Sequence, residues 1–173
     1  PLPPALRAAH ELVVAGIAMR RLHTQIARDA LTRAREAARQ AGIPALNAEV
    51  DNAAHALDSP AARLIARGKE RFLQLHEVED LLASKTFVVD ACRYSVHDAH
   101  TTTSLATRPI LFTLARALAE AWPGDVPRAT LIARAFRMKH GDESHRARLR
   151  VEMGRLRRVL RDQATISATP EGF

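Results

Sequence analysis

One segment of this chain combines a regular apolar stripe with a dense series of positive charges. The segment SHRARLRVEMGRLRRVLR, residues 144–161, contains seven arginines and one glutamate among eighteen residues. Its large apolar side chains recur at spacings of four, three and four, at Leu149, Met153, Leu156 and Leu160. At about 100° per residue these four positions share one face of an α-helix. The segment is therefore expected to form a helix that packs this face on a core and leaves its arginines outside.

The positive charge of the chain is concentrated around this segment. The whole sequence carries a formal net charge of +7, from 26 Lys and Arg against 19 Asp and Glu. Residues 137–161 hold nine basic and three acidic side chains, a net charge of +6. Such a patch is the electrostatic footprint expected for a polyanionic ligand. The alternative is that the arginines are solvated, or paired with acidic neighbours such as Asp142, Glu143 and Glu152.

Composition indicates a folded protein of one or two small domains. The 173 residues are 47% hydrophobic and 26% charged, which is ordinary for a globular protein. The longest apolar run, residues 12–19, is shorter than the ~18 residues that span a bilayer, and it lacks the features of a signal peptide. The single cysteine, Cys92, permits no internal disulfide. We therefore expect a cytoplasmic protein without a membrane partner.

The polar residues form no pattern typical of a catalytic or metal site. The sequence has no P-loop, no dinucleotide-binding glycine fingerprint, no nucleophile elbow and no zincin motif. His97 and His100 are separated by a turn and have no acidic or cysteine partner at ligand spacing. We expect neither an enzyme nor a bound metal or cofactor.

The first half of the chain, residues 1–84, is predicted to be a helical bundle or a set of helix hairpins. Prolines, glycines and capping residues divide it into a helix to about Arg20, a second from Thr24 to Gly42, a third after Pro44, and a fourth through residues 60–67 capped by Ser59. The apolar set expected for the first helix is Leu6, Leu12, Val13, Ile17 and Leu22. Abundant alanine favours closely packed helix pairs that resemble tetratricopeptide-type hairpins. Residues 71–84 fit either a short strand followed by a helical turn or one helix.

The second half, residues 85–173, has a different pattern. From Thr86, short runs of β-branched and aromatic residues predict three antiparallel strands, at residues 86–90, 93–96 and 101–105. Two helices, a loop and the basic helix are expected to follow, at Arg108–Ala121, Arg128–Phe136, residues 137–143 and from a Ser144 cap. Residues 164–173 predict a strand and a tight turn, after which a returning strand is expected to be missing. The predicted class is mainly α with a small antiparallel sheet.

This order resembles the DNA-binding domain of OmpR/PhoB-type response regulators, a winged helix-turn-helix. The similar segments are VVDACRYSV with LATRPILFTLARAL, GDVPRATLIARAF, RVEMGRLRRVL and ISATPEGF, within residues 86–173. The family's recognition helix ends in an arginine-rich motif, here residues 155–160, and its wing carries a glycine–aromatic pair, here Gly172–Phe173. A receiver domain with a phosphorylatable aspartate is not found in the sequence, so the resemblance does not imply phosphorelay control.

The resemblance implies a DNA-binding transcriptional regulator. Residues 144–160 would enter a major groove, and flanking arginines and the wing would contact phosphates. The candidate DNA-binding residues are His145, Arg146, Arg148, Arg150, Val151, Gly154, Arg155, Arg157, Arg158 and Thr169. Arg150, Arg155 and Arg158 are the leading arginines, Val151 could contact a thymine methyl, and Gly154 either permits close approach or is an incidental surface glycine. Expected partners are double-stranded DNA, RNA polymerase or another regulatory protein, and a second copy bound through the helical region. The alternative function is a protein-interaction or scaffold module that uses the same surfaces.

Overall fold

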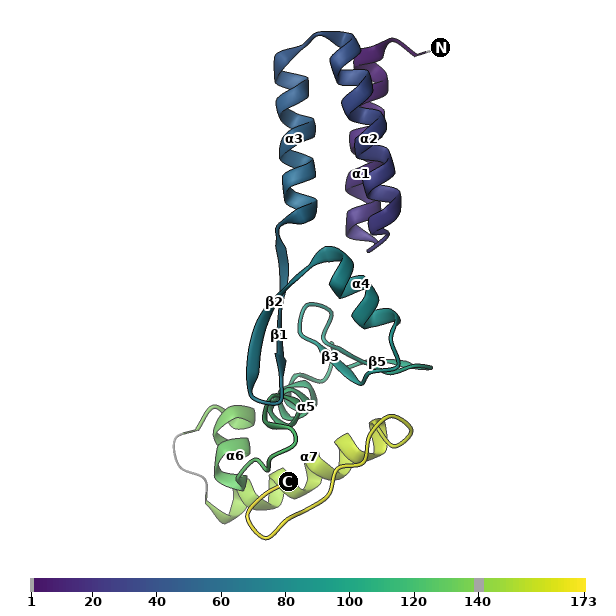
Figure 1. The fold of residues 1–173 in the computed structure, drawn as a ribbon. Helices are drawn as coiled ribbons and strands as arrows, with labels where there is room; N and C mark the ends of the chain where they lie inside the picture. Colours follow the sequence, from purple (N-terminus) through teal and green to yellow (C-terminus); the bar gives the residue numbers. More distant parts are fainter. Residues whose placement is uncertain (1, 139–141) are drawn as a thin grey trace. The chain divides into compact units, whose positions relative to one another are not determined.

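The computed structural model describes residues 2–138 and 142–173, and these form two compact units (Figure 1). The first unit comprises residues up to Leu64 together with Arg71–Leu81, and the second comprises Ile65–Glu70 and Leu82–Phe173. Helices dominate both units, and the strands form one two-stranded and one three-stranded sheet. The predicted class, mainly α with a small antiparallel sheet, is confirmed. Within the part of the chain that the structure describes, no helix is long and apolar enough to cross a bilayer.

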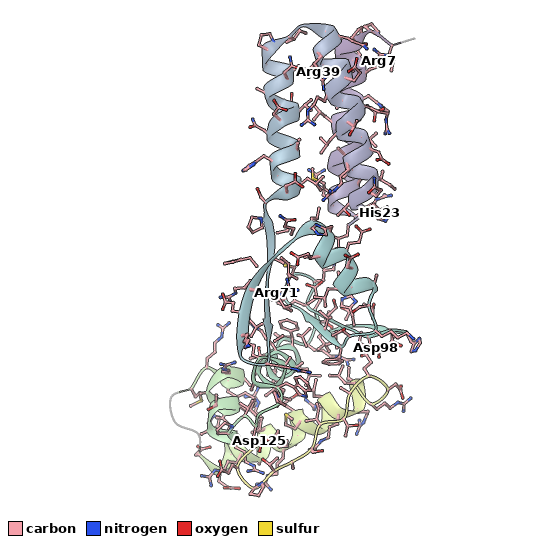
Figure 2. The ribbon with its side chains drawn as sticks, viewed as in Figure 1. Arg7, His23, Arg39, Arg71, Asp98 and Asp125 are labelled. Atoms are coloured by element: carbon pink, nitrogen blue, oxygen red, sulfur yellow. The ribbon has the colours of Figure 1, made fainter. Side chains whose placement is uncertain are left out.

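Three helices form most of the first unit: α1 (Pro4–Arg20), α2 (Thr24–Ala41) and α3 (Pro44–Asp58). Gly42 ends α2 in the left-handed conformation, at φ 66°, as predicted. The helices α1 and α2 run antiparallel, because Arg7 and Arg39 lie near one end of the pair and His23 near the other (Figure 2). The Arg7 guanidinium accordingly donates to the Gln40 side chain across the pair.

Alanines form most of the buried contact between α1 and α2, together with Leu31, and the predicted Leu12 packs against them. The buried alanines are Ala8, Ala15 and Ala18 of α1 and Ala27, Ala30, Ala34, Ala37 and Ala38 of α2. The expectation that Leu6, Val13 and Ile17 face this core is wrong, because these side chains are 56%, 62% and 44% exposed. Small side chains let the two helix backbones approach closely, so this face excludes the larger residues of α1.

A β-hairpin replaces the fourth helix expected through residues 60–67, so that prediction and its Ser59 cap are wrong. Strands β1 (Pro60–Ala66) and β2 (Lys69–Gln74) pair as a two-stranded sheet. Arg67 and Gly68 join them, both with positive φ, which is the geometry of a type I′ hairpin turn. Gly68 therefore turns a hairpin instead of ending a helix. Helix α4 (Leu75–Ala83) follows β2 directly, so the strand-then-helix alternative is the correct one.

Thr24 does not act as the predicted cap of α2. His23 occupies the N-cap position without a side-chain cap bond, and Thr24 is the first helical residue. The hydroxyl and backbone N–H of Thr24 both donate to the Glu79 carboxylate of α4. These two hydrogen bonds, the one from the hydroxyl first, lower the pKa of Glu79. The Thr24 hydroxyl, which the local pattern predicted to cap α2, therefore bonds Glu79, a residue distant in sequence.

The three predicted strands of the second unit are present and shorter than expected. Strands β3 (Val88–Asp90), β4 (Ser95–His97) and β5 (Thr102–Ser104) form an antiparallel sheet in that order. The start predicted for the second strand is two residues too early, because the Asp90 carboxylate accepts from the backbone N–H groups of Cys92 and Arg93 and closes a turn there.

Three helices complete the second unit: α5 (Pro109–Ala121), α6 (Arg128–Phe136) and α7 (Glu143–Val159). Their shared core contains Leu114, Leu131 and Met153, none of which has measurable exposure. Residues 137–138 and 142 lie in the expected loop, and residues 139–141 of it lie outside the described residues. The predicted loop is one residue too long, because Glu143 is the first residue of α7.

The C-terminal segment after α7 forms the predicted tight turn without the predicted strand. The turn is closed by one backbone bond, from the Thr169 N–H to the Gly172 carbonyl, and by a bond from the Gly172 N–H to the Thr169 hydroxyl. Gly172 also makes an isolated bridge with Pro127. Arginine side chains, and not a neighbouring strand, bond three carbonyls of the segment. The Arg157 guanidinium donates to the Ile166 carbonyl, and the Arg128 guanidinium donates to those of Thr169 and Pro170. The strand prediction is therefore wrong at residues 164–168.

Candidate nucleic-acid interface

Helix α7, which carries most of the predicted site, begins with a charged cap. The Asp142 carboxylate accepts from the His145 backbone N–H at 3.0 Å and contacts the His145 imidazole at 2.6 Å. The bond from the backbone N–H, followed by the one from the imidazole, lowers the pKa of Asp142. A negative charge here also interacts favourably with the positive end of the helix dipole. The predicted Ser144 cap is wrong, because Asp142 occupies that position.

The inner face of α7 is the stripe predicted from the sequence. Leu149, Met153, Leu156 and Leu160 are each at most 2% exposed and pack with the cores of α5 and α6. Because this face is completely buried, the orientation of the helix about its own axis is determined. The remaining positions of α7 therefore point sideways or outward.

Val151 and Gly154 lie on the exposed side of α7. The Val151 side chain is 54% exposed. A Cβ added at Gly154 would meet no atom within 4 Å, so the protein itself does not require glycine there. The two residues form a shallow, uncharged interruption between arginines on either side.

Four of the arginines form ion pairs at the surface. Arg146 and Arg150 share Glu143, at 3.5 and 2.8 Å, and Arg155 pairs with Glu152 at 2.8 Å. Arg161 pairs with the adjacent Asp162 at 3.2 Å. The four guanidinium side chains remain 61–75% exposed in these pairs. The exposed pairs of Arg146, Arg150 and Arg161 contribute only about 0–1 kcal/mol, so a phosphate can replace their carboxylates at little cost. The Arg155 pair differs, because the Glu152 side chain is only 11% exposed and would remain as a buried carboxylate without its partner.

Two other arginines contact aromatic rings. The Arg148 guanidinium lies over the Phe136 ring at 4.6 Å from its centroid. Arg157 is half-buried, donates from Nε to the Ile166 carbonyl at 2.8 Å and lies 5.4 Å from the Phe173 centroid. Arg157 therefore helps to form the C-terminal segment, whereas Arg148 stays exposed.

Arg158 is exposed and has no such role. It makes no hydrogen bond, ion pair or ring contact with any residue that the structure describes. Together with Arg108 and Arg155 it lines an open hollow of about 590 Å³ between the first turn of α5 and the last turns of α7. The Glu152 carboxylate also lines this hollow and pairs with Arg155, so three guanidinium groups and the positive end of α5 face one carboxylate and the lining carries a net positive charge.

Arg108 is the residue that sequence reasoning missed. It stands at the N-cap of α5 and is 35 or more residues away from the basic segment. Its position before Pro109 signals a helix start, but no local pattern indicates that this start lies beside α7.

Two of the predicted DNA-contact residues, Thr169 and His145, already form hydrogen bonds with residues close to them in the chain. The Thr169 hydroxyl accepts from the Gly172 backbone N–H at 2.9 Å, inside the C-terminal turn. His145 is half-buried, with its ring beside Phe136 and bonded to Asp142. Its bonded imidazole is therefore less free to reach a ligand than the exposed arginines are.

The charged side chains offer no alternative site for a metal ion. Among residues 2–138 and 142–173, no three His, Cys, Asp or Glu side chains come together in a group that could hold one.

No protein-family model, curated protein or solved structure matches this chain.

Proposed function

We propose that this protein is a DNA-binding transcriptional regulator that inserts α7 into the major groove of duplex DNA. The observation that carries the proposal is the division of α7 into a fully buried apolar face and an exposed face of arginines around Val151 and Gly154. An α-helix fits the major groove, and exposed arginines on both sides of it lie within reach of the two phosphate backbones.

The elements around α7 support the same proposal. A three-stranded sheet, three helices and a C-terminal turn follow one another in the order typical of a winged helix-turn-helix. Helix α6 packs beside α7 in the shared core, as the first helix of such a motif does. The turn at Thr169–Gly172 follows α7 in the chain, as a wing follows the recognition helix in this architecture, where it contacts a neighbouring part of the duplex.

The arginines are expected to contribute unequally. Arg158 and Arg108 line one hollow without a paired carboxylate and are the better placed of its arginines for phosphate oxygens, whereas Arg155 is held there by Glu152. Arg150, next to the exposed Val151, is better placed for a base, because the Val151 side chain offers an apolar contact to a thymine methyl beside it. Arg157 is expected to act indirectly, by maintaining the C-terminal segment.

The test is the salt dependence of binding to a fluorescent duplex, measured by anisotropy. Six exposed arginines of the basic segment are available to displace counterions on the duplex: Arg146, Arg148, Arg150, Arg155, Arg158 and Arg161. If all six displace counterions, log K falls against log salt with a slope of about −5. Replacing Arg150, Arg155 and Arg158 with alanine should bring the slope to about −2.5 and weaken binding at least about a hundredfold.

A matched control removes the same charge elsewhere. Arg28, Arg35 and Arg39 of α2 also form exposed ion pairs, with Asp58, Asp51 and Glu36. Their replacement by alanine should leave the affinity and the salt slope near those of the wild type. Equal effects from both triple variants would contradict the proposal, since they would reflect net charge alone.

Single variants at Arg157 and Arg158 distinguish an arginine that contacts DNA from one that stabilises the fold. Arg158→Ala should weaken DNA binding without lowering the unfolding midpoint, whereas Arg157→Ala should lower that midpoint because its bond to Ile166 and its contact with Phe173 are lost. If an acidic protein displaces the duplex and binds more tightly in the same assay, the protein-interaction alternative is favoured instead.

A further inference from the structure

Helix α1 has a second apolar face that the first unit does not cover. Leu6, Val13 and Ile17 are 56%, 62% and 44% exposed, and Ala9 and Gly16 lie between them at spacings of three and four. This spacing is typical of a helix that packs along another helix. Because the alanine face of α1 is already occupied by α2, the second face requires a different partner.

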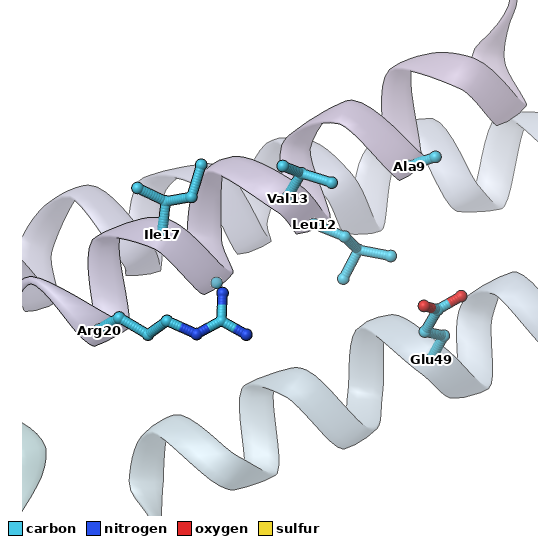
Figure 3. Close-up of a pocket in the computed structure, with 7 residues that line it drawn as sticks. Ala9, Leu12, Val13, Ile17, Arg20 and Glu49 are labelled. Carbon is cyan, nitrogen blue, oxygen red and sulfur yellow. The ribbon is translucent and has the colours of Figure 1, made fainter.

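The second face borders a groove between α1 and α3. The groove encloses about 380 Å³, and Leu12, Val13 and Ile17 form most of its apolar lining (Figure 3). Gly16 provides no side chain to fill it, and a Cβ there would come no closer than 3.9 Å to any side chain. The groove is therefore open, with apolar side chains along α1 and charged side chains at its ends.

The two ends of the groove carry opposite charges. The Arg20 guanidinium extends into it from α1, and the Glu49 carboxylate points toward it from α3 (Figure 3). Neither side chain forms an ion pair or a side-chain hydrogen bond with the residues that the structure describes. Most other acidic side chains of the first unit, by contrast, have a cationic partner within 4.0 Å, as Glu11 has in Arg33.

We propose that this groove binds a second copy of the chain, through a two-fold interface in which the α1 helices run antiparallel. A surface that is positive at one end and negative at the other is complementary to itself after such a rotation. Arg20 of each copy then meets Glu49 of the other, and the exposed faces of α1 cover one another. All the residues involved lie in the first unit, so this proposal can fail while the DNA-binding proposal stands, and the reverse.

The decisive experiment uses two charge-reversal variants of the full chain, Arg20→Glu and Glu49→Arg, in sedimentation at increasing concentration. The wild type should approach twice its 19.0 kDa monomer mass. Each variant alone should associate at least about a hundredfold more weakly, because the two-fold axis creates two like-charge contacts. An equimolar mixture of the two variants should regain the dimer, since both contacts then join opposite charges.

The mixture distinguishes contact between copies from contact within one copy, because mixing cannot restore a contact within one copy.

A second pair of variants tests the apolar face. Val13→Glu should abolish the dimer, while Ile26→Glu, at a 51% exposed position of α2 outside the groove, should not. Circular dichroism checks that each variant is folded. A wild type that stays monomeric throughout, or a mixture that does no better than its components, overturns the proposal.

Discussion

Replacing Gly172 with alanine should detach the C-terminal segment from the second unit. A Cβ at this position would lie 1.9 Å from the Val126 carbonyl oxygen and 2.6 Å from its carbon. Both atoms belong to the backbone, so no side-chain rotation can relieve the overlap. The segment must move away, and the two bonds between the backbones of Val126 and Phe173, at 2.9 and 3.2 Å, are then lost.

The magnitude follows from the contacts that are lost. Two backbone hydrogen bonds are worth about 1 kcal/mol each in net terms. The Phe173 ring also loses its contacts with Arg128 and Arg157, each at 5.4 Å, which contribute about 0.5 kcal/mol apiece. Together the free energy of unfolding should fall by about 3 kcal/mol.

The same substitution at Gly154 provides the control. A Cβ there meets nothing within 4 Å, and the residue lies inside α7. Alanine favours a helix interior over glycine, so Gly154→Ala should raise the free energy of unfolding by about 1 kcal/mol. One chemical change is thus expected to act in opposite directions at two positions of the same unit.

Urea unfolding followed by Trp122 fluorescence measures both variants. Trp122 is the only tryptophan and lies in the second unit, so its signal reports on that unit. With a slope of about 2 kcal/mol per molar urea, the midpoint should fall by about 1.5 M for Gly172→Ala and rise by about 0.5 M for Gly154→Ala. A Gly172→Ala midpoint equal to that of the wild type would refute the reasoning, because it would mean that the bridge to Val126 contributes nothing.

Two further outcomes are expected in the second unit. Because the pKa of Asp142 is held below its ordinary 3.8, the carboxylate stabilises the fold above about pH 4, and this contribution is lost as the pH falls through the lowered pKa. Asp142→Ala should therefore lower the thermal midpoint at pH 7 and differ less from the wild type at pH 3; an equal difference at both pH values would exclude the charge as the cause. Leu156→Ala, at a fully buried position, should cost about 2–5 kcal/mol in a urea titration, whereas Val151→Ala, which is exposed, should cost less than about 0.5 kcal/mol.

Local sequence patterns predicted the elements that depend on local physics. The stripe from Leu149 to Leu160 identified the buried face of α7, because only one side of a helix can be apolar in an otherwise charged segment. Helix α6 has the predicted bounds, and Gly42 ends α2 in the left-handed conformation, since glycine adopts that conformation without steric strain.

Two incorrect predictions considered each segment alone and overlooked its contact with another segment. Residues 60–67 could form a helix by their own propensity, and they are a strand because the next segment pairs with them across the Arg67–Gly68 turn. Thr24 suits a cap, and Glu79, fifty-five residues later, bonds its hydroxyl instead. In the first case the neighbouring strand of a hairpin changed the outcome, and in the second a residue distant in sequence did.

The sequence by itself determined that a basic helix would bury one apolar face and expose its arginines, because helical periodicity is a property of consecutive residues. Only the tertiary structure decided what each arginine does. Arg157 and Arg158 are adjacent and chemically identical, yet Arg157 bonds the C-terminal segment while Arg158 faces the hollow beside Arg108. Similarly, α1 has two apolar faces in sequence, and packing against the alanines of α2 left the one with larger side chains uncovered. The physical reason is that such roles arise from contacts between segments far apart in the chain, which no local pattern encodes.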